Sequence, residues 1–199
     1  MFKGILRESF KYSLPSLIII LIAIIAVRIA YCIERKKKIY IYREYWNLFA
    51  ICYLILFYDL VTRVDINTYS GVNLIPFAEI FRYSFESKMF YYNVMGNIIM
   101  FIPFGFIVAT YLKPKKIWPH LTIGFIVSLT IESVQRNIGR SFDIDDILLN
   151  TIGCVIGYIL YLLFIRIYKK LPLKFKTVWF NNLFCLFVTV IIGVIIIFI

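Results

Sequence analysis

The stretch Ile131–Asn150, which reads IESVQRNIGRSFDIDDILLN, places a dense run of polar and charged side chains between two long apolar runs. Apolar runs of about 18–22 residues recur along the chain, which is the length that a helix needs to cross a hydrocarbon core of about 30 Å. A polar run between two such helices is either an ordinary connecting loop or the floor of a site at the membrane surface. The other segments of the chain bear on that choice.

The composition excludes an ordinary soluble domain. Of the 199 residues, 62% are hydrophobic and 17% are charged, and the mean hydropathy is +0.86. These values predict an all-α, polytopic transmembrane helical bundle. The net charge of +11 comes from short Lys and Arg clusters between apolar runs, as in loops that set membrane topology, so we expect no nucleic-acid partner. The four cysteines are scattered singly without metal-ligand spacing, so neither disulfides nor a cofactor are expected.

Six membrane spans follow from the apolar runs. They cover about Leu14–Ile33, Tyr45–Val61, Tyr91–Leu112, Trp118–Gln135, Ile147–Ile167 and Val178–Ile199. Lys and Arg are richer in segments 34–44, 113–117 and 166–176 than in segments 62–90 and 136–146, where acids offset them. The positive-inside rule makes the first group cytoplasmic and both termini extracytoplasmic. Arg28, close to the end of the first span, is expected to extend its long side chain to the nearby interface.

The longest connection, between spans two and three, has helical periodicity. Leu74, Phe77, Phe81 and Phe85 recur at steps of three and four residues, which predicts a helix lying in the membrane interface. A loop that shields its aromatic residues against the bundle is the alternative. We expect three regions: a two-span region over 1–72, a three-span core over 73–167, and a cytoplasmic loop with the sixth span over 168–199.

Polar side chains on three predicted spans converge at one depth. Asn97 lies on span three, Glu132 and Gln135 on span four, and Asp146 and Asn150 on span five. At a rise of 1.5 Å per residue, helical spacing puts them in the outer third of the bilayer. This convergence predicts a polar site that faces outward.

Some of these residues also have structural interpretations. Asp143, followed three residues later by Asp146, resembles a helix N-cap with a carboxylate variant of the capping box. Asn97 and Asn150 could hydrogen-bond between helices. Likewise, a GxxxG pattern, formed by Gly153 and Gly157, allows helices to approach closely.

Glu132 is harder to explain as scaffold, because a carboxylate within a membrane span is costly unless it is paired. Its expected partners are Arg136 and Arg140, either as a structural ion pair or as part of a functional site. Arg140 could instead hold a phosphate, and Asp143 and Asp146 are weak candidates for a divalent cation. Residue spacing alone does not decide among an ion pair, a phosphate site and a cation site.

Several separated motifs resemble the VanZ-like family in order and spacing over Asn73–Tyr161. They are Asn73–Phe77, Asn97–Gly105, Glu132–Gln135, Gly139, Arg140, Asp143, Asp146, Asn150, Gly153 and Gly157. The resemblance implies a multi-pass protein of the bacterial plasma membrane, in a family whose namesake confers low-level resistance to the glycopeptide teicoplanin. The motif positions carried over as a ligand-binding site are Asn97, Glu132, Gln135, Arg140, Asp143, Asp146 and Asn150.

Three functions compete. The first is a non-enzymatic envelope protein whose outward-facing pocket binds a lipid headgroup or a cell-wall precursor and so reduces the action of lipoglycopeptides. The second is a lipid phosphate hydrolase or transferase in which Arg140 holds phosphate, carboxylates hold a divalent metal and Glu132 acts as base. The lack of a dedicated nucleophile and the single histidine, His120, weigh against an enzyme. Transport ranks last, because the inner halves of the spans are apolar. Membrane lipids are the expected partners, with a lipid-linked precursor or a lipoglycopeptide as further candidates.

Overall fold

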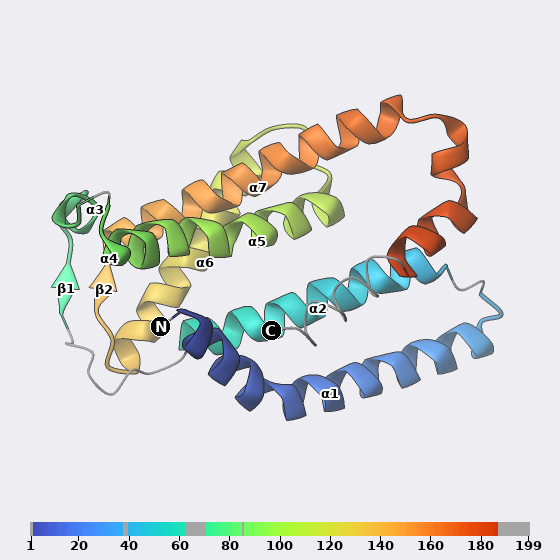
Figure 1. The fold of residues 1–199 in the computed structure, drawn as a ribbon, viewed down its shortest axis with the longest axis horizontal. Coiled ribbons are helices and arrows are strands. Elements are labelled where there is room, and N and C mark those ends of the chain that lie inside the picture. Colours follow the sequence, from blue (N-terminus) through green and yellow to red (C-terminus); the bar gives the residue numbers. More distant parts are fainter. Residues whose placement is uncertain (1, 38–39, 63–70, 85, 187–199) are drawn as a thin grey trace. The chain divides into compact units, whose positions relative to one another are not determined.

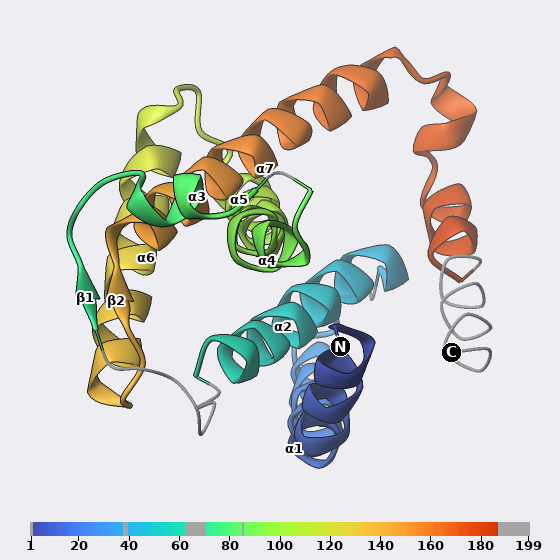
Figure 2. The same ribbon diagram turned by 60° about the vertical axis from the view of Figure 1, so that its left-hand side comes forward.

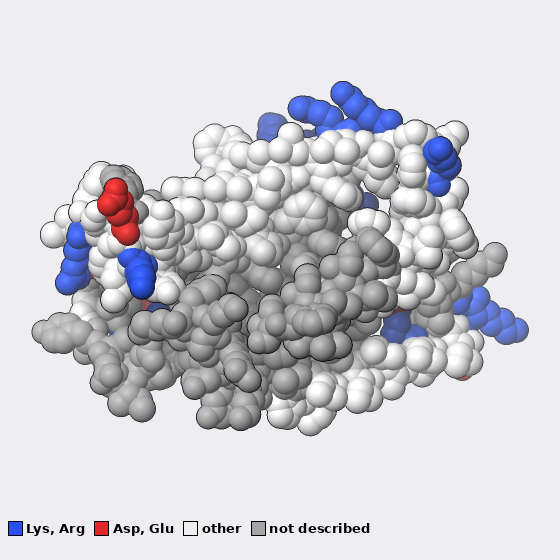
Figure 3. Space-filling view, viewed as in Figure 1, with Lys and Arg blue, Asp and Glu red and all other residues white. Residues whose placement is uncertain are grey.

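The computed structural model describes residues 2–37, 40–62, 71–84 and 86–186, and for residues 2–14 only the backbone. These ranges form seven α-helices and two short β-strands (Figure 1). The chain divides into two compact units, one made of 1–56 with 167–199 and the other of 57–166. On the face seen in Figure 3, most of the described atoms are uncharged, and Lys and Arg gather in a few separate groups.

The first unit contains two long helices that follow each other in the chain. They are α1 (Phe2–Glu34) and α2 (Ile41–Thr62), whose last turn belongs to the second unit. Arg28 of α1 forms two hydrogen bonds with Glu44 of α2, at 2.9 and 2.8 Å. The extension of Arg28 to the interface stays a prediction, and the structure adds that its guanidinium is paired with a carboxylate.

Among the described residues, four helices are long and apolar enough to cross a membrane. They are Pro15–Glu34 of α1, α2, the continuous helix Lys88–Leu112, and α7 (Ile144–Lys170). They match the first, second, third and fifth predicted spans. The Lys88–Leu112 helix comprises α4 (Lys88–Phe90), the π-helical turn η1 (Tyr91–Met95) and α5 (Gly96–Leu112).

The other two predicted spans are not supported in the same way. The fourth, Trp118–Gln135, forms helix α6 (Trp118–Asn137), close to the expected bounds, but it is not among the four candidate spans. Its buried face carries His120, Ser128, Glu132 and Gln135, which lower its hydropathy. The sixth, Val178–Ile199, extends outside the described residues from 187 onward; residues 178–186 are helical and follow the 3₁₀ turn η2 (Leu173–Lys176).

In the second unit, helices α5 and α7 pack with their backbones almost in contact, side by side in both ribbon views (Figures 1 and 2). A Cβ added at Gly105 would lie 2.0 Å from the carbonyl oxygen of Cys154, and one at Gly157 would lie 2.2 Å from that of Ile102. Gly153 has a similarly close neighbour on α5. The predicted close approach of helices at the GxxxG pattern is thus confirmed, and its partner is α5.

Helices α6 and α7 contact each other through three residue pairs, and the paired residues are spaced four apart on each helix. The three pairs are Ser128 with Asn150, hydrogen-bonded at 2.9 Å, Gly124 against the Cys154 side chain, and His120 stacked on Tyr158 with ring centroids 4.4 Å apart. This regular repeat, which is the spacing of one helical ridge, buries one face of each helix. It therefore fixes the register that sets the N-terminus of α7 against the C-terminal half of α6.

The connection before α4 is not the continuous interfacial helix predicted from Leu74. Strand β1 (Val72–Asn73) pairs in parallel with β2 (Phe142–Asp143), as Figure 2 shows, and helix α3 covers only Ala78–Arg82. Pro76 disfavours helical backbone in the residue before it, and Phe77 adopts a left-handed conformation with φ of 68°. Phe85 lies outside the described residues.

Candidate functional site

Asp143, at the end of β2, caps the N-terminus of α7. Its Oδ1 atom accepts a hydrogen bond of 2.8 Å from the backbone N–H of Asp145, two residues along, which is the usual N-cap geometry. The predicted N-cap is confirmed. The reciprocal half of the predicted capping box is wrong, because Asp146 does not bond back to Asp143 but accepts a hydrogen bond from Asn97 of α5.

Glu132 supplies the missing half of the cap from another helix. Its side chain is 2% exposed, and Oε2 accepts a hydrogen bond of 3.0 Å from the backbone N–H of Asp143. Neither Arg136 nor Arg140 forms an ion pair within 4.0 Å of it in the described part of the chain, so the predicted direct ion pair is wrong, although the charge of Arg140 acts on Glu132 from a greater distance. The unsatisfied N–H groups at the start of a helix attract carboxylates, and one of these N–H groups takes the place of the expected arginine.

Asp145 has more contacts in this region than the residue pattern predicted, and it was not among the predicted site residues. Its side chain is fully buried, and Oδ2 accepts hydrogen bonds from the backbone N–H groups of Glu79 at 2.8 Å and Ile80 at 3.3 Å. Oδ1 accepts a third from the N–H of Phe77. Phe77 cannot cap α3 with its own side chain, so the orphan N–H groups of that helix take Asp145 as acceptor. An apolar residue at the N-cap position of α3 is the sequence feature that indicates an acceptor from elsewhere in the chain.

Asn73 joins β1 to the same network. Its Nδ2 donates to Oδ1 of Asp143 at 3.1 Å, and its own Oδ1 accepts from the backbone N–H of Ile75. Hydrogen bonds therefore run without a break from the backbone of α3 through Asp145 and Asp143 to Glu132 of α6. The motif residues Asn73–Phe77 are fastened to the N-terminus of α7 by this chain.

Burial raises the pKa of the Asp143 carboxyl above its ordinary value. The hydrogen bond from the Asp145 N–H lowers the pKa, the Asp145 carboxylate raises it, and the Asn73 amide lowers it again. Because burial is the largest of these effects, the protonated form of Asp143 is favoured relative to a solvent-exposed aspartate.

The remaining predicted site residues lie in three further places. Asn97 and Asp146 link α5 to α7, while Asn150 bonds to Ser128 within the α6–α7 contact. Gln135 donates to the carbonyl oxygen of Val61, in the last turn of α2, at 3.0 Å. The structure thus does not show all seven residues lining one cavity.

Arg140 is the cation of this region. Its side chain is half-buried, and its Nη1 donates a long hydrogen bond of 3.4 Å to the same Val61 carbonyl oxygen. Gly139 precedes it with φ of 88°, a left-handed conformation that glycine adopts readily in a tight turn. The charge of Arg140 also interacts with the carboxylates of Glu132 and Asp146, without an ion pair within 4.0 Å among the described residues. Its N–H groups that make no hydrogen bond there can bind a further carboxylate or phosphate.

The carboxylates of this region are occupied by N–H donors rather than arranged around an ion. Within the described ranges, no group of three or more His, Cys, Asp or Glu side chains could hold a metal ion. This finding gives no support to Asp143 and Asp146 as metal ligands.

An exposed apolar segment lies beside this network. Leu74, Ile75, Phe77 and Phe81 all have more than half of their side-chain surface accessible, with Ile75 at 70% and Phe81 at 77%. Water-exposed apolar groups in such density mark a surface that meets another apolar phase or molecule. The hydrogen bonds to Asp143 and Asp145 hold this segment in a defined position.

Comparison with known proteins places the chain in a family. Residues 45–165, more than half of the chain, match the VanZ/LLP1 family. The chain is also 29% identical over 119 residues to Protein VanZ of Enterococcus faecium, an alignment that covers 57% of this chain and 68% of that relative. No solved structure matches it. With four candidate membrane-spanning helices and the motif network inside the matched region, the chain belongs to the VanZ/LLP1 family.

Proposed function

We propose that this protein is a non-enzymatic component of the bacterial cell envelope that binds an amphipathic anion at the outer surface of the plasma membrane. The ligand is a lipid headgroup or a lipid-linked cell-wall precursor, and its occupation of the site lowers susceptibility to lipoglycopeptides such as teicoplanin. Family membership and four candidate membrane spans support the membrane setting.

One observation carries the proposal: a basic side chain and an exposed apolar segment are both held next to the N-terminus of α7. Arg140 lies three residues before Asp143, and Asp143 and Asp145 hold the exposed residues of the Leu74–Phe81 segment. An arginine with spare N–H groups suits a phosphate or carboxylate, and the apolar segment suits an acyl or polyprenyl chain. A ligand with both parts matches a membrane lipid or a lipid-linked precursor.

The exposed apolar side chains also favour an interfacial position for this segment. Phe81 and Ile75 would enter the boundary between headgroups and acyl chains, where aromatic and basic residues are enriched in membrane proteins. The predicted topology, with positive loops inside, puts this end of the bundle on the extracytoplasmic side. Acylated glycopeptides insert into the same leaflet, so a ligand site there lies where it can interfere with them.

The proposal is tested by deleting the gene and measuring susceptibility to teicoplanin beside vancomycin. We expect greater susceptibility to teicoplanin, restored by the wild-type gene, and a smaller change for vancomycin, which has no acyl chain. Unchanged susceptibility to both drugs would remove the resistance role. Binding of lipids to the purified protein, measured separately, tests the site without reference to resistance.

A further inference from the structure

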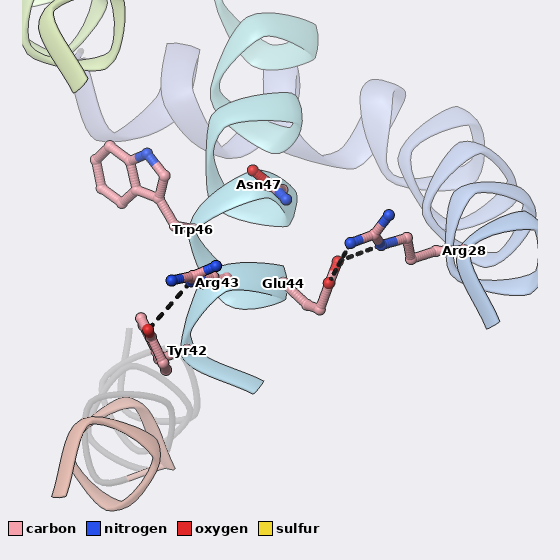
Figure 4. A pocket seen from close by; sticks show the side chains of 6 residues that line it. All are labelled: Arg28, Tyr42, Arg43, Glu44, Trp46 and Asn47. Atoms are coloured by element: carbon pink, nitrogen blue, oxygen red, sulfur yellow. Dashed lines mark hydrogen bonds and ion pairs between the residues drawn. The ribbon is translucent and has the colours of Figure 1, made fainter. Parts of the chain in front are cut away.

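A pocket lies between α1 and α2, in the first unit of the chain. Its cavity volume is about 330 Å³, within the range of small-molecule sites. The side chains that line it, drawn in Figure 4, are Arg28, Tyr42, Arg43, Glu44, Trp46 and Asn47. None of these residues takes part in the hydrogen-bond network around Asp143.

One of the two arginines in this pocket is neutralised. Arg28 and Glu44 form a bidentate pair through Nε and Nη2, with side chains 46% and 20% exposed. Figure 4 shows Glu44 turned toward Arg28. The pair uses two of the three guanidinium nitrogens of Arg28 and joins the two helices at the pocket wall.

Arg43 carries the net charge of the pocket. Among the described residues no carboxylate lies within 4.0 Å of it, and its Nε donates to the Tyr42 hydroxyl at 3.1 Å. The guanidinium carbon lies 5.1 Å from the centroid of the Tyr40 ring and 5.7 Å from that of Tyr42. Aromatic rings therefore position this cation and leave its terminal N–H groups for another partner. Two arginines and one glutamate leave one positive charge.

The surroundings favour an anion that belongs to a membrane. Arg35, Lys36 and Lys37 follow the end of α1 and add positive potential at this end of the helix. Trp46 and the tyrosines are residue types that concentrate at the level of lipid headgroups. The adjoining helices, Pro15–Glu34 and α2, are both candidate membrane spans. Basic clusters next to a membrane span attract anionic lipids, and the planar fork of arginine matches phosphate oxygens.

We propose that the pocket at Arg43 binds the phosphate group of an anionic phospholipid. Arg43 supplies the main charge-assisted hydrogen bonds, the remaining nitrogen of Arg28 supplies a further donor, and Trp46 and Tyr42 contact the glycerol backbone. The bound lipid links the C-terminal part of α1 to the N-terminal part of α2. Arg140 is not one of the residues that line this pocket, so the test of lipid binding here does not depend on the function proposed above.

The test measures lipid binding to the full chain in detergent. Native mass spectrometry with matched amounts of phosphatidylglycerol and phosphatidylcholine would compare the wild type with Arg43→Gln, with Arg43→Lys and with the control Lys116→Gln. Lys116 is an exposed lysine outside this pocket, so its substitution removes the same charge elsewhere. Size-exclusion chromatography and thermal unfolding confirm that each variant is folded.

We expect the wild type to prefer phosphatidylglycerol, and Arg43→Gln to weaken its binding by about tenfold, the value of one charge-assisted hydrogen bond. Arg43→Lys should retain part of the binding, and Lys116→Gln all of it. Equal losses in Arg43→Gln and Lys116→Gln, or equal retention of the two lipids by the wild type, would overturn the site. A competition experiment with inorganic phosphate distinguishes a lipid from a free anion. If phosphate competes as strongly as the lipid at equal concentration, the ligand is a free anion and the lipid assignment fails.

Discussion

The carboxylate of Asp145, fully buried at the start of α7, accepts a hydrogen bond of 2.8 Å from the backbone N–H of Glu79, which lies 66 residues earlier in the chain. This contact gives α3 the N-terminal acceptor that its own sequence lacks. It also fastens the C-terminal part of the exposed apolar segment to a buried side chain of the second unit, while Asp143 holds Asn73 at its N-terminal end.

Replacing Asp145 should release that segment. In Asp145→Ala three backbone N–H groups lose their acceptor, and we expect a loss of about 3 kcal/mol in the free energy of unfolding, because hydrogen bonds to charged groups are worth about 1.5–3 kcal/mol each and are not additive. Thermal unfolding in detergent and limited proteolysis within 74–84 are the measurements.

The control for this prediction is Glu79→Gln, which removes the exposed ion pair with Arg82 but keeps the backbone bond to Asp145. Surface ion pairs contribute about 0–1 kcal/mol, so its stability should be close to that of the wild type. If both variants lose the same stability and neither gains a cleavage site within 74–84, Asp145 does not hold the segment.

Gly157 should tolerate no side chain. A Cβ there would lie 2.2 Å from the carbonyl oxygen of Ile102 and 2.6 Å from the backbone nitrogen of Phe106, both on α5. Gly157→Ala therefore forces α5 and α7 apart, and we expect a fall in folded yield and in the unfolding temperature. Gly96→Ala is the matched comparison, because its Cβ would have no neighbour closer than 3.8 Å and alanine favours a helix. Equal stability of the two variants would mean that the helices are not in close contact at Gly157.

The stability of the protein should depend on the ionisation of Asp143. An acid whose pKa is raised by folding stabilises the fold most below its unfolded pKa, and this contribution is lost as the pH rises through the raised value. Asp143→Asn keeps a side-chain oxygen for the N–H of Asp145 and the Asn73 amide but cannot ionise. Its unfolding temperature should therefore fall less than that of the wild type between acidic and mildly alkaline pH.

The comparison for the pH dependence is Glu86→Gln, which removes an exposed acid elsewhere in the same unit. This variant should follow the wild-type pH profile. A steeper decline for Asp143→Asn than for the wild type would show that the ionised carboxylate is the stabilising form and that burial is not the dominant effect on its pKa.

Much of the helical framework could be predicted from the sequence, because apolar run length determines it directly. Four of the predicted spans coincide with helices that can cross a membrane, and α6 begins at the expected Trp118. The interfacial helix was predicted from the spacing of its apolar residues alone. Pro76 and the left-handed Phe77 confine that helix to α3, and the periodicity of side chains does not report backbone conformation.

The contacts of the candidate site were less predictable for a related reason. Side-chain spacing suggested an arginine as partner of Glu132, whereas the partner is a backbone N–H of Asp143 that becomes available only when β2 meets α6. The role of Asp145 depends in the same way on a segment that is distant in the chain. The Asn97–Asp146 bond could not be specified either, although both residues were singled out, since it requires the packing of α5 on α7.

Arg140 and Arg136 provide the most direct comparison, since they lie four residues apart in the chain, Arg136 exposed at the end of α6 and Arg140 half-buried beside the network. A deletion strain carrying wild type, Arg140→Gln or Arg136→Gln at equal expression would be tested for teicoplanin susceptibility. The predicted result is that wild type and Arg136→Gln restore resistance while Arg140→Gln does not, because its anion binding is weakened by about tenfold. Full restoration by Arg140→Gln would contradict the proposed ligand site.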